Sequence, residues 1–353
     1  MPKTFILALT NVIEETPDTR TLILDQPAVD RIHYLAGQYL TLKVEIDGHA
    51  HYRTYSMSSV SGLDDHIAVT VKRVEHGLVS NYIHDHFEAG RLVEFLRPGG
   101  RFTFLAGLTE QRHIVLIGAG SGITPLMSIL RSALFGEPKS RVSLLYGSRD
   151  QEHIIFRQTL EELEKQFPKR LQVQHVLSRP RKELPESYWT GRIDQPKLEK
   201  WLADIQPTEP SPSLFYLCGP EAMMNLAEEA ITATGIPPKA IFSERFVATD
   251  ETTAAQKQIK GPTRWVELLY GDDHYRVQVP PGMTVLQAAL AQGISLPFSC
   301  KRGICSTCMS RLLQGQVDME NPESLLEFEI QNGKVLTCQA HPTTDDVKIL
   351  VGG

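Results

Sequence analysis

Four of the five cysteines stand near the C-terminus, as Cys300, Cys305, Cys308 and Cys338. The first three follow the pattern C-x4-C-x2-C, and the fourth lies well downstream. This spacing is typical of four thiolates that hold a [2Fe-2S] cluster. The backbone amides of residues 301–304 can point at the sulfur atoms. A cluster of this kind transfers single electrons, so the pattern predicts a redox protein.

Zinc and disulfides are the alternative uses of these thiols. A structural zinc site generally has two short C-x2-C or His pairs, and here only Cys305 and Cys308 form one. Disulfides need an oxidising compartment, but residues 1–20 contain Glu14, Glu15 and Asp18 and no long apolar core. No secretory signal is therefore expected, and a cytoplasmic location follows. Zinc remains the alternative to the cluster.

A glycine run, Gly118-Ala119-Gly120-Ser121-Gly122-Ile123-Thr124, follows a strand predicted over residues 113–117 and precedes a helix predicted over 125–134. A glycine turn between a strand and a helix can cradle a phosphate group. The run departs from G-x-G-x-x-G because Ile123 occupies the sixth place, and it lacks the lysine of a P-loop. It still predicts nucleotide binding.

The next predicted strand ends at Ser148 and Arg149, where the adenosine ribose of a dinucleotide would lie. An arginine there accommodates a 2′-phosphate, whereas an acid favours NAD. Because Asp150 follows Arg149 directly, the pattern favours NADPH and leaves NADH open.

Two further groups of residues could bind a cofactor. Arg53-Thr54-Tyr55-Ser56 offers a guanidinium, an aromatic plane and a hydroxyl, with Arg53 and Tyr55 on one strand face. An ordinary strand surface has the same composition. Residues 77–80 open a helix predicted over 79–87, where free amides would favour an anion, although a plain N-cap fits equally.

Several short strands and turns in the first hundred residues predict an antiparallel β-barrel. Strands then alternate with helices, which predicts a parallel sheet. Residues near the C-terminus suit a small mixed sheet that carries the cysteine loop. We therefore expect a multidomain protein with a barrel over residues 1–107, an α/β nucleotide domain over 108–247, a linker over 248–262 and an α+β domain over 263–353.

Composition excludes two classes of function. The net charge of −6 disfavours binding to nucleic acid, which generally needs a basic face. The longest apolar runs, such as residues 114–117, have the length of a strand and not of a membrane span. We expect no membrane partner.

Taken together, these motifs and their order resemble the ferredoxin-NADP reductase superfamily with a C-terminal plant-type [2Fe-2S] ferredoxin domain of β-grasp type, over nearly the whole chain. They are similar in particular to the reductase components of bacterial multicomponent oxygenases, among them the phenylacetyl-CoA epoxidase system. The resemblance implies a bound FAD, with FMN less favoured, a [2Fe-2S] cluster and NADPH or NADH. It also implies an enzyme that passes electrons from the nucleotide through the flavin and the cluster to a terminal oxygenase.

The same resemblance assigns roles to single residues. It implies that Arg53 pairs with the flavin pyrophosphate, Tyr55 packs on the isoalloxazine and Ser56 hydrogen-bonds near N5. The implied catalytic residues are Tyr55, Ser56, Cys218, Glu244 and Phe246. The implied cofactor-binding residues are Arg53, Thr54, Tyr55, Ser56, Val71, Lys72, Gly77, Leu78, Val79, Ser80, Gly118, Gly120, Gly122, Thr124, Ser148, Arg149, Cys218, Gly219 and Pro220.

Some alternatives stay open. Cys218, at the end of an apolar run, is equally typical of a buried strand-end thiol. The acidic stretch Asp318, Glu320, Glu323, Glu327 and Glu329 is either a docking face for a basic partner or a solvated surface. A non-catalytic iron–sulfur redox sensor and a general ferredoxin-type reductase with several acceptors are the competing functions.

Overall fold

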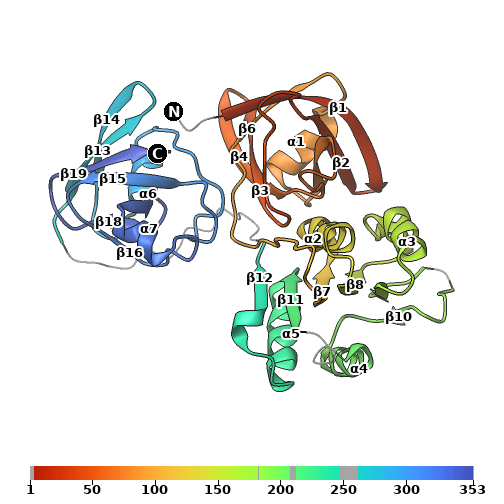
Figure 1. Ribbon diagram of the computed structural model, residues 1–353. Coiled ribbons are helices and arrows are strands. Elements are labelled where there is room, and N and C mark those ends of the chain that lie inside the picture. Colours follow the sequence, from red (N-terminus) through yellow and green to blue (C-terminus); the bar gives the residue numbers. More distant parts are fainter. Residues whose placement is uncertain (1–3, 182, 207–211, 247–260, 353) are drawn as a thin grey trace.

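The computed structural model describes residues 4–181, 183–206, 212–246 and 261–352. Within these ranges the chain forms three bodies, each built around its own main sheet (Figure 1). This arrangement confirms the multidomain fold that the sequence predicts. The linker expected over 248–262 lies outside the described residues, apart from residues 261 and 262.

The N-terminal body is a six-stranded antiparallel sheet in the order β4-β3-β6-β1-β2-β5. Beyond β4, Met57 pairs with Val69 in β5, and the Ser58 N–H donates to the Ala68 carbonyl at 2.9 Å, so the two outer strands meet and the sheet closes. Buried leucines, isoleucines and valines from alternate positions fill the interior. Its elements are β1 (Thr4–Thr16), β2 (Thr19–Asp25), β3 (Tyr39–Ile46), β4 (His49–Ser56), β5 (His66–Lys72), α1 (Leu78–His86) and β6 (Leu92–Leu96).

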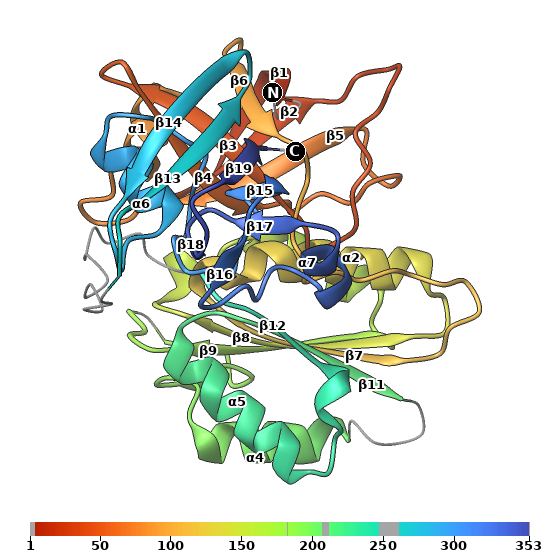
Figure 2. The ribbon, with the colours of Figure 1, turned by 90° about the vertical axis from the view of Figure 1, so that its left-hand side faces the viewer.

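The second body is a six-stranded, fully parallel sheet in the order β10-β9-β8-β7-β11-β12. Helices α2 and α3 pack on one face and α4 and α5 on the other, and Figure 2 shows α2 and the α4–α5 pair on opposite sides. Its elements are β7 (His113–Ala119), α2 (Ile123–Gly136), β8 (Arg141–Ser148), α3 (Arg157–Gln166), β9 (Leu171–Leu177), β10 (Trp189–Thr190), α4 (Gln195–Ile205), β11 (Ser213–Cys218), α5 (Glu221–Ala233) and β12 (Ile241–Glu244).

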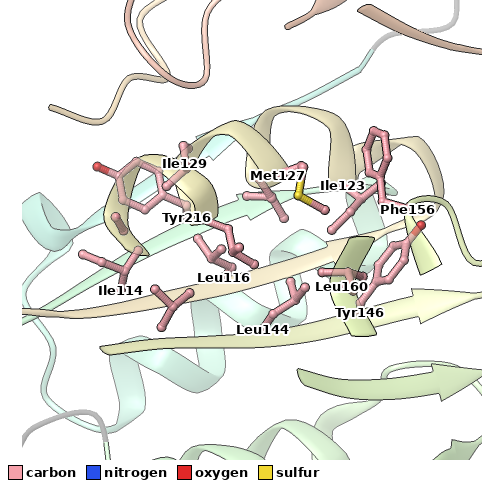
Figure 3. Close-up of a cluster of buried hydrophobic side chains, with 14 of the residues drawn as sticks. Ile114, Leu116, Ile123, Met127, Ile129, Leu144, Tyr146, Phe156, Leu160 and Tyr216 are labelled. Carbon is pink, nitrogen blue, oxygen red and sulfur yellow. The ribbon is translucent and has the colours of Figure 1, made fainter. Parts of the chain in front are cut away.

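Close packing under α2 fixes the start of that helix against the sheet. In Figure 3, Ile123 and Met127 of α2 lie over Leu116 of β7 and Leu144 of β8. All four side chains are at most 2% exposed. Strands covered on both faces read as continuous apolar runs, which is why the sequence identified β7 and β8.

The C-terminal body is a five-stranded mixed sheet in the order β14-β13-β19-β15-β17, with a separate β16–β18 pair. Helix α6 begins at a capping box in which Thr284 and Gln287 bond each other's backbone N–H groups, and its buried face packs on the sheet. The elements are β13 (Arg264–Tyr270), β14 (Asp273–Val279), α6 (Val285–Ala291), β15 (Met309–Gln314), β16 (Val317–Met319), α7 (Glu327–Gln331), β17 (Lys334–Leu336), β18 (Ala340–Pro342) and β19 (Val347–Val351).

Polar contacts join the barrel to the nucleotide body. Arg131 of α2 makes a two-pronged ion pair with Asp64, both N–O distances being 2.7 Å. The Gly37 N–H donates to the Ser128 hydroxyl at 2.8 Å. Both contacts place the middle of α2 against the barrel. No helix in the described parts of the chain is long and apolar enough to cross a membrane.

Candidate functional site

In the nucleotide body, the strand order places the expected ligand crevice at the carboxyl ends of β7 and β11. From β7 the sheet continues through β8 in one direction, and from β11 through β12 in the other, so the strand order reverses between β7 and β11. Ligands of open α/β sheets bind at such a reversal. The register places Cys218 opposite Gly118 on one side and opposite Glu244 on the other.

The glycine run lies here, between β7 and α2, so it follows a strand and precedes a helix as the sequence predicts. Gly122 packs against the end of β11, where a Cβ atom would stand 2.0 Å from the Cys218 carbonyl oxygen. Gly120 has φ of +55°, and its carbonyl accepts the Tyr146 hydroxyl at 3.0 Å. Thr124 is buried and its hydroxyl donates to the Ser121 carbonyl. The turn therefore needs glycine both for its backbone conformation and for its close approach to β11.

Asp150 does not face the crevice as a free acid. Its side chain is 1% exposed, accepts the Glu152 N–H at 3.1 Å and pairs with His153. Arg181 approaches the same carboxylate, with Nε 3.0 Å from Oδ2. Arg149 remains largely exposed and contacts His153, while its Nη2 lies 3.6 Å from Asp18 of the barrel. Two guanidinium groups therefore stand at the end of β8, and Arg181 had no signal in the sequence.

The end of β4 meets the end of β12. The Ser56 hydroxyl donates to Glu244 Oε2 at 3.2 Å, joining the barrel to the nucleotide body. Tyr55 packs against the barrel core, and burial raises the pKa of its phenol, so it stays neutral. The Arg53 guanidinium donates to the Tyr52 carbonyl at 2.8 Å.

The residues expected around α1 lie at the end of β5, directly before α1 and in its first turn. Gly77 directly precedes the helix, and the buried Ser80 hydroxyl accepts the Val74 N–H at 3.1 Å. Val79 and Val71 are buried, Leu78 is half exposed, and Lys72 lies 3.7 Å from Asp18. Whether this helix start binds the flavin phosphates stays a prediction.

All three bodies contribute to one cavity of about 590 Å³. It brings together Thr54 and Ser56 of the barrel, Glu244 and Phe246 of the nucleotide body, and the cysteine loop. Further lining residues that sequence reasoning missed are Tyr39, Arg101, Phe102, Ser299, Ser306 and Ser324. They belong to three segments, at residues 39, 101–102 and 299–324, that are far apart in the sequence, and no local pattern links these segments.

Burial controls the charges around this cavity. It raises the pKa of Glu244 to about 8, partly offset by the hydrogen bond from Ser56. Burial, with the neighbouring Glu244 carboxyl, also raises the pKa of Cys218 well above that of a free thiol. At neutral pH both groups are therefore uncharged, and the cavity carries no net negative charge from them.

The raised pKa of Glu244 makes stability depend on pH. The folded protein holds this proton up to about pH 8, whereas the unfolded chain releases it near pH 4.5. Its stabilising effect is therefore complete below pH 4.5 and is lost as the pH rises through 8. We expect the stability of Glu244→Gln, which cannot ionise, to rise relative to the wild type by about 4 kcal/mol between pH 5 and pH 9, because each unit of the pKa difference corresponds to about 1.4 kcal/mol. Urea unfolding at the two pH values measures this, and equal differences at both would contradict it.

The four C-terminal cysteines come together in two pairs. Cys300 hydrogen-bonds with Cys305, and Cys308 with Cys338. Across the described residues, no three His, Cys, Asp or Glu side chains gather around one ion position. Two thiols for each of two irons is the arrangement that a [2Fe-2S] cluster needs.

The loop between the cysteines points N–H groups at sulfur. The Arg302 N–H donates to Cys300 Sγ at 3.4 Å, and the Cys300 N–H to Cys305 Sγ at 3.5 Å. Gly303 has φ of +78°, and a Cβ there would lie 1.7 Å from the Asn321 carbonyl oxygen. Hydrogen bonding from Cys305 and from backbone amides lowers the pKa of Cys300. Such donors stabilise thiolates, so the residues fit an iron–sulfur cluster.

Three family models match the chain in the order of its bodies. They describe an oxidoreductase FAD-binding domain over residues 7–104, an oxidoreductase NAD-binding domain over 116–229 and a 2Fe-2S iron-sulfur cluster binding domain over 271–343.

Similar proteins span nearly the whole length. The chain is 36% identical over 346 residues to one subunit of the 1,2-phenylacetyl-CoA epoxidase of Escherichia coli, covering 97% of this chain and 96% of that protein. It is 33% identical over 357 residues to the ferredoxin reductase component of 3-ketosteroid-9-alpha-monooxygenase of Rhodococcus rhodochrous, covering 98% and 97%. Among solved structures, phthalate dioxygenase reductase shares the fold, with a TM-score of 0.59 at 21% identity, over 99% of this chain and 97% of that one.

Proposed function

Because the chain belongs to the family of flavin and iron–sulfur reductases that serve multicomponent oxygenases, we propose that it supplies electrons from NADPH to an oxygenase of the phenylacetyl-CoA epoxidase kind. The oxidoreductase class, the FAD, the pyridine nucleotide and the [2Fe-2S] cluster follow from family membership itself. The choice of NADPH and of the partner is the proposal.

One observation carries the function most directly. A single cavity is lined by the end of the barrel strand β4, by the end of the nucleotide-body strand β12 and by Cys300 and Cys305 of the cysteine loop. A flavin bound here would supply the chemistry that links hydride transfer, which moves two electrons together, to the single-electron chemistry of an iron–sulfur cluster. The barrel, the nucleotide body and the C-terminal body therefore all line the same cavity.

Several side chains at this cavity fix its shape and could orient the cofactors. Ser56 and Glu244 bridge two bodies by a hydrogen bond and fix the ends of β4 and β12 relative to each other. Arg53 and Tyr55 would bind and orient the flavin, and Phe246, partly exposed at the cavity, would cover the opposite side. Cys218 and Glu244, both neutral at pH 7, would place no negative charge beside a bound nicotinamide.

The partner is tested by reconstitution. The purified protein is combined with NADPH and the oxygenase subunits of a phenylacetyl-CoA epoxidase, and separately with the oxygenase of a 3-ketosteroid monooxygenase. We expect NADPH-dependent product only, or mainly, with the first. Equal amounts of product with the two oxygenases would favour the general reductase with several acceptors. Oxidation of NADPH without reduction of either oxygenase or of cytochrome c would overturn the proposal.

The preference for NADPH rests on Arg149 and Arg181 at the end of β8. Asp150, the residue that could favour NADH, is buried and holds His153. A guanidinium that pairs with a 2′-phosphate contributes about 1.5–3 kcal/mol. We expect Arg149→Ala to raise the KM for NADPH by roughly tenfold to a hundredfold while the KM for NADH changes little. Arg157→Ala, on the surface of α3 and paired with Glu161, is the control. A parallel rise in both KM values would contradict recognition of the phosphate.

A further inference from the structure

Two neighbouring side chains of β3 reach across to the cysteine loop. The Tyr39 hydroxyl accepts the Ser306 N–H at 3.0 Å and lies 3.0 Å from the Ser306 hydroxyl. Thr41, on the same strand face, has its hydroxyl 3.3 Å from that of Thr307. Side chains alternate along a strand, so Tyr39 and Thr41 point to the same side of β3. Tyr39 contacts Ser306 and Thr41 contacts Thr307.

Tyr39 is held rigidly at this contact. Its backbone N–H and carbonyl both bond to Gly99, at 2.9 and 3.0 Å, and its side chain is 7% exposed. The ring lies against Gly100, which has φ of +106° and where a Cβ would approach ring carbons within 3.0 Å. Glycine at this turn therefore makes room for the ring, which has little freedom to turn away.

The contact stands beside the electron-transfer cavity. Ser306 follows Cys305 in the chain, and both line the cavity together with Tyr39, Ser56 and Glu244. Burial raises the pKa of Tyr39, so the phenol keeps its proton. It can accept the Ser306 N–H and donate to the Ser306 hydroxyl at the same time.

We propose that Tyr39 is a positioning residue for electron transfer inside the protein, because its hydroxyl holds the cysteine loop, through Ser306, against the flavin barrel. The inference rests on the proposed function, since it takes the cavity as the flavin site and the cysteines as the cluster ligands. Transfer of an electron between two centres falls steeply with their separation. Loss of the hydroxyl would therefore loosen the loop and slow transfer to the cluster.

Tyr39→Phe in the fully loaded protein tests this, with Tyr52→Phe as the matched control. Tyr52 also faces the C-terminal body, where its hydroxyl lies 3.5 Å from that of Tyr270, but it does not line the cavity. In Tyr39→Phe we expect hydrogen exchange of the peptide that contains Ser306 to quicken by about two- to tenfold, the range of one hydrogen bond. The ratio of cytochrome c to ferricyanide reduction should fall by at least about twofold. Tyr52→Phe should change neither quantity.

Unchanged exchange and an unchanged ratio in Tyr39→Phe would overturn the inference, as would equal effects in the two variants. If Tyr39→Phe does not retain its flavin, Thr41→Val removes the neighbouring hydroxyl contact and must lower the same ratio for the inference to stand. Failure of the proposed function is seen separately. In that case the wild-type protein itself would show no flavin reduction by NADPH or would lack the cluster.

Discussion

Replacing Cys305 with serine is expected to abolish reduction of cytochrome c while ferricyanide reduction, taken directly from the flavin, largely persists. Cys305 is buried, pairs with Cys300 and receives the Cys300 N–H. A serine hydroxyl is a poor ligand for iron compared with a thiolate, so the cluster should be lost or fail to assemble. Visible absorption, acid-labile sulfide and the two acceptor assays measure this together.

Cys218→Ser is the matched control for the cluster. Cys218 lies at the end of β11 and packs in the core of the nucleotide body, whereas Cys308 and Cys338 pack in the core of the C-terminal body. We expect this variant to keep the absorption and the labile sulfide of the cluster. Equal loss of both acceptor activities in Cys305→Ser, with the flavin still bound, would contradict the order of flavin before cluster.

The sequence predicted the elements whose signals are local. The strand predicted over residues 113–117 is β7, which continues to Ala119, and the helix predicted over 125–134 is α2, which is two residues longer at each end. The cysteine spacing predicted the cluster loop, and the structure pairs the four thiols. In these cases a run of neighbouring residues carries the whole signal, because each pattern reflects one strand face or one loop.

Other elements were missed for two different reasons. Helix α4 has Leu198, Trp201, Leu202 and Ile205 at helical spacing, and Asp194 caps it, so the sequence carried a signal that was overlooked. Strand β12 has only four residues and gave no periodic signal. It nevertheless positions Glu244, whose role was inferred from the family resemblance and not from local pattern.

The contacts between bodies could not be predicted from the sequence. Tyr39 and Ser306 are 267 residues apart, and each lies in a segment with its own local explanation. The contact of Tyr39 with Ser306 is set by the packing of two bodies. Asp150 shows a different limit, since its carboxylate caps the local turn at residues 151–153 and pairs with His153, three residues away, and the sequence shows an acid there but not which groups occupy it.

Among glycine-to-alanine substitutions in the glycine run, Gly122→Ala is expected to lower the free energy of unfolding the most. Gly122 has φ of −60°, which alanine adopts freely, so the effect comes from contact alone. The new Cβ would lie 2.0 Å from the Cys218 carbonyl oxygen and 2.5 Å from its carbon, both backbone atoms that cannot rotate away. The start of α2 must therefore separate from β11, and we expect a loss of about 3 kcal/mol in the free energy of unfolding.

Gly120→Ala is the control that distinguishes the effect of a steric contact from the effect of backbone conformation. Gly120 has φ of +55°, which is unfavourable for alanine, but nothing lies within 4 Å of the new Cβ. Its cost should be about 1 kcal/mol, from the backbone alone. Urea unfolding ranks the two variants, and the KM for NADPH should rise further in Gly122→Ala because the glycine run and the start of α2 move away from β11. If Gly120→Ala proved the more damaging, backbone conformation and not the approach of α2 to β11 would determine the shape of the nucleotide site.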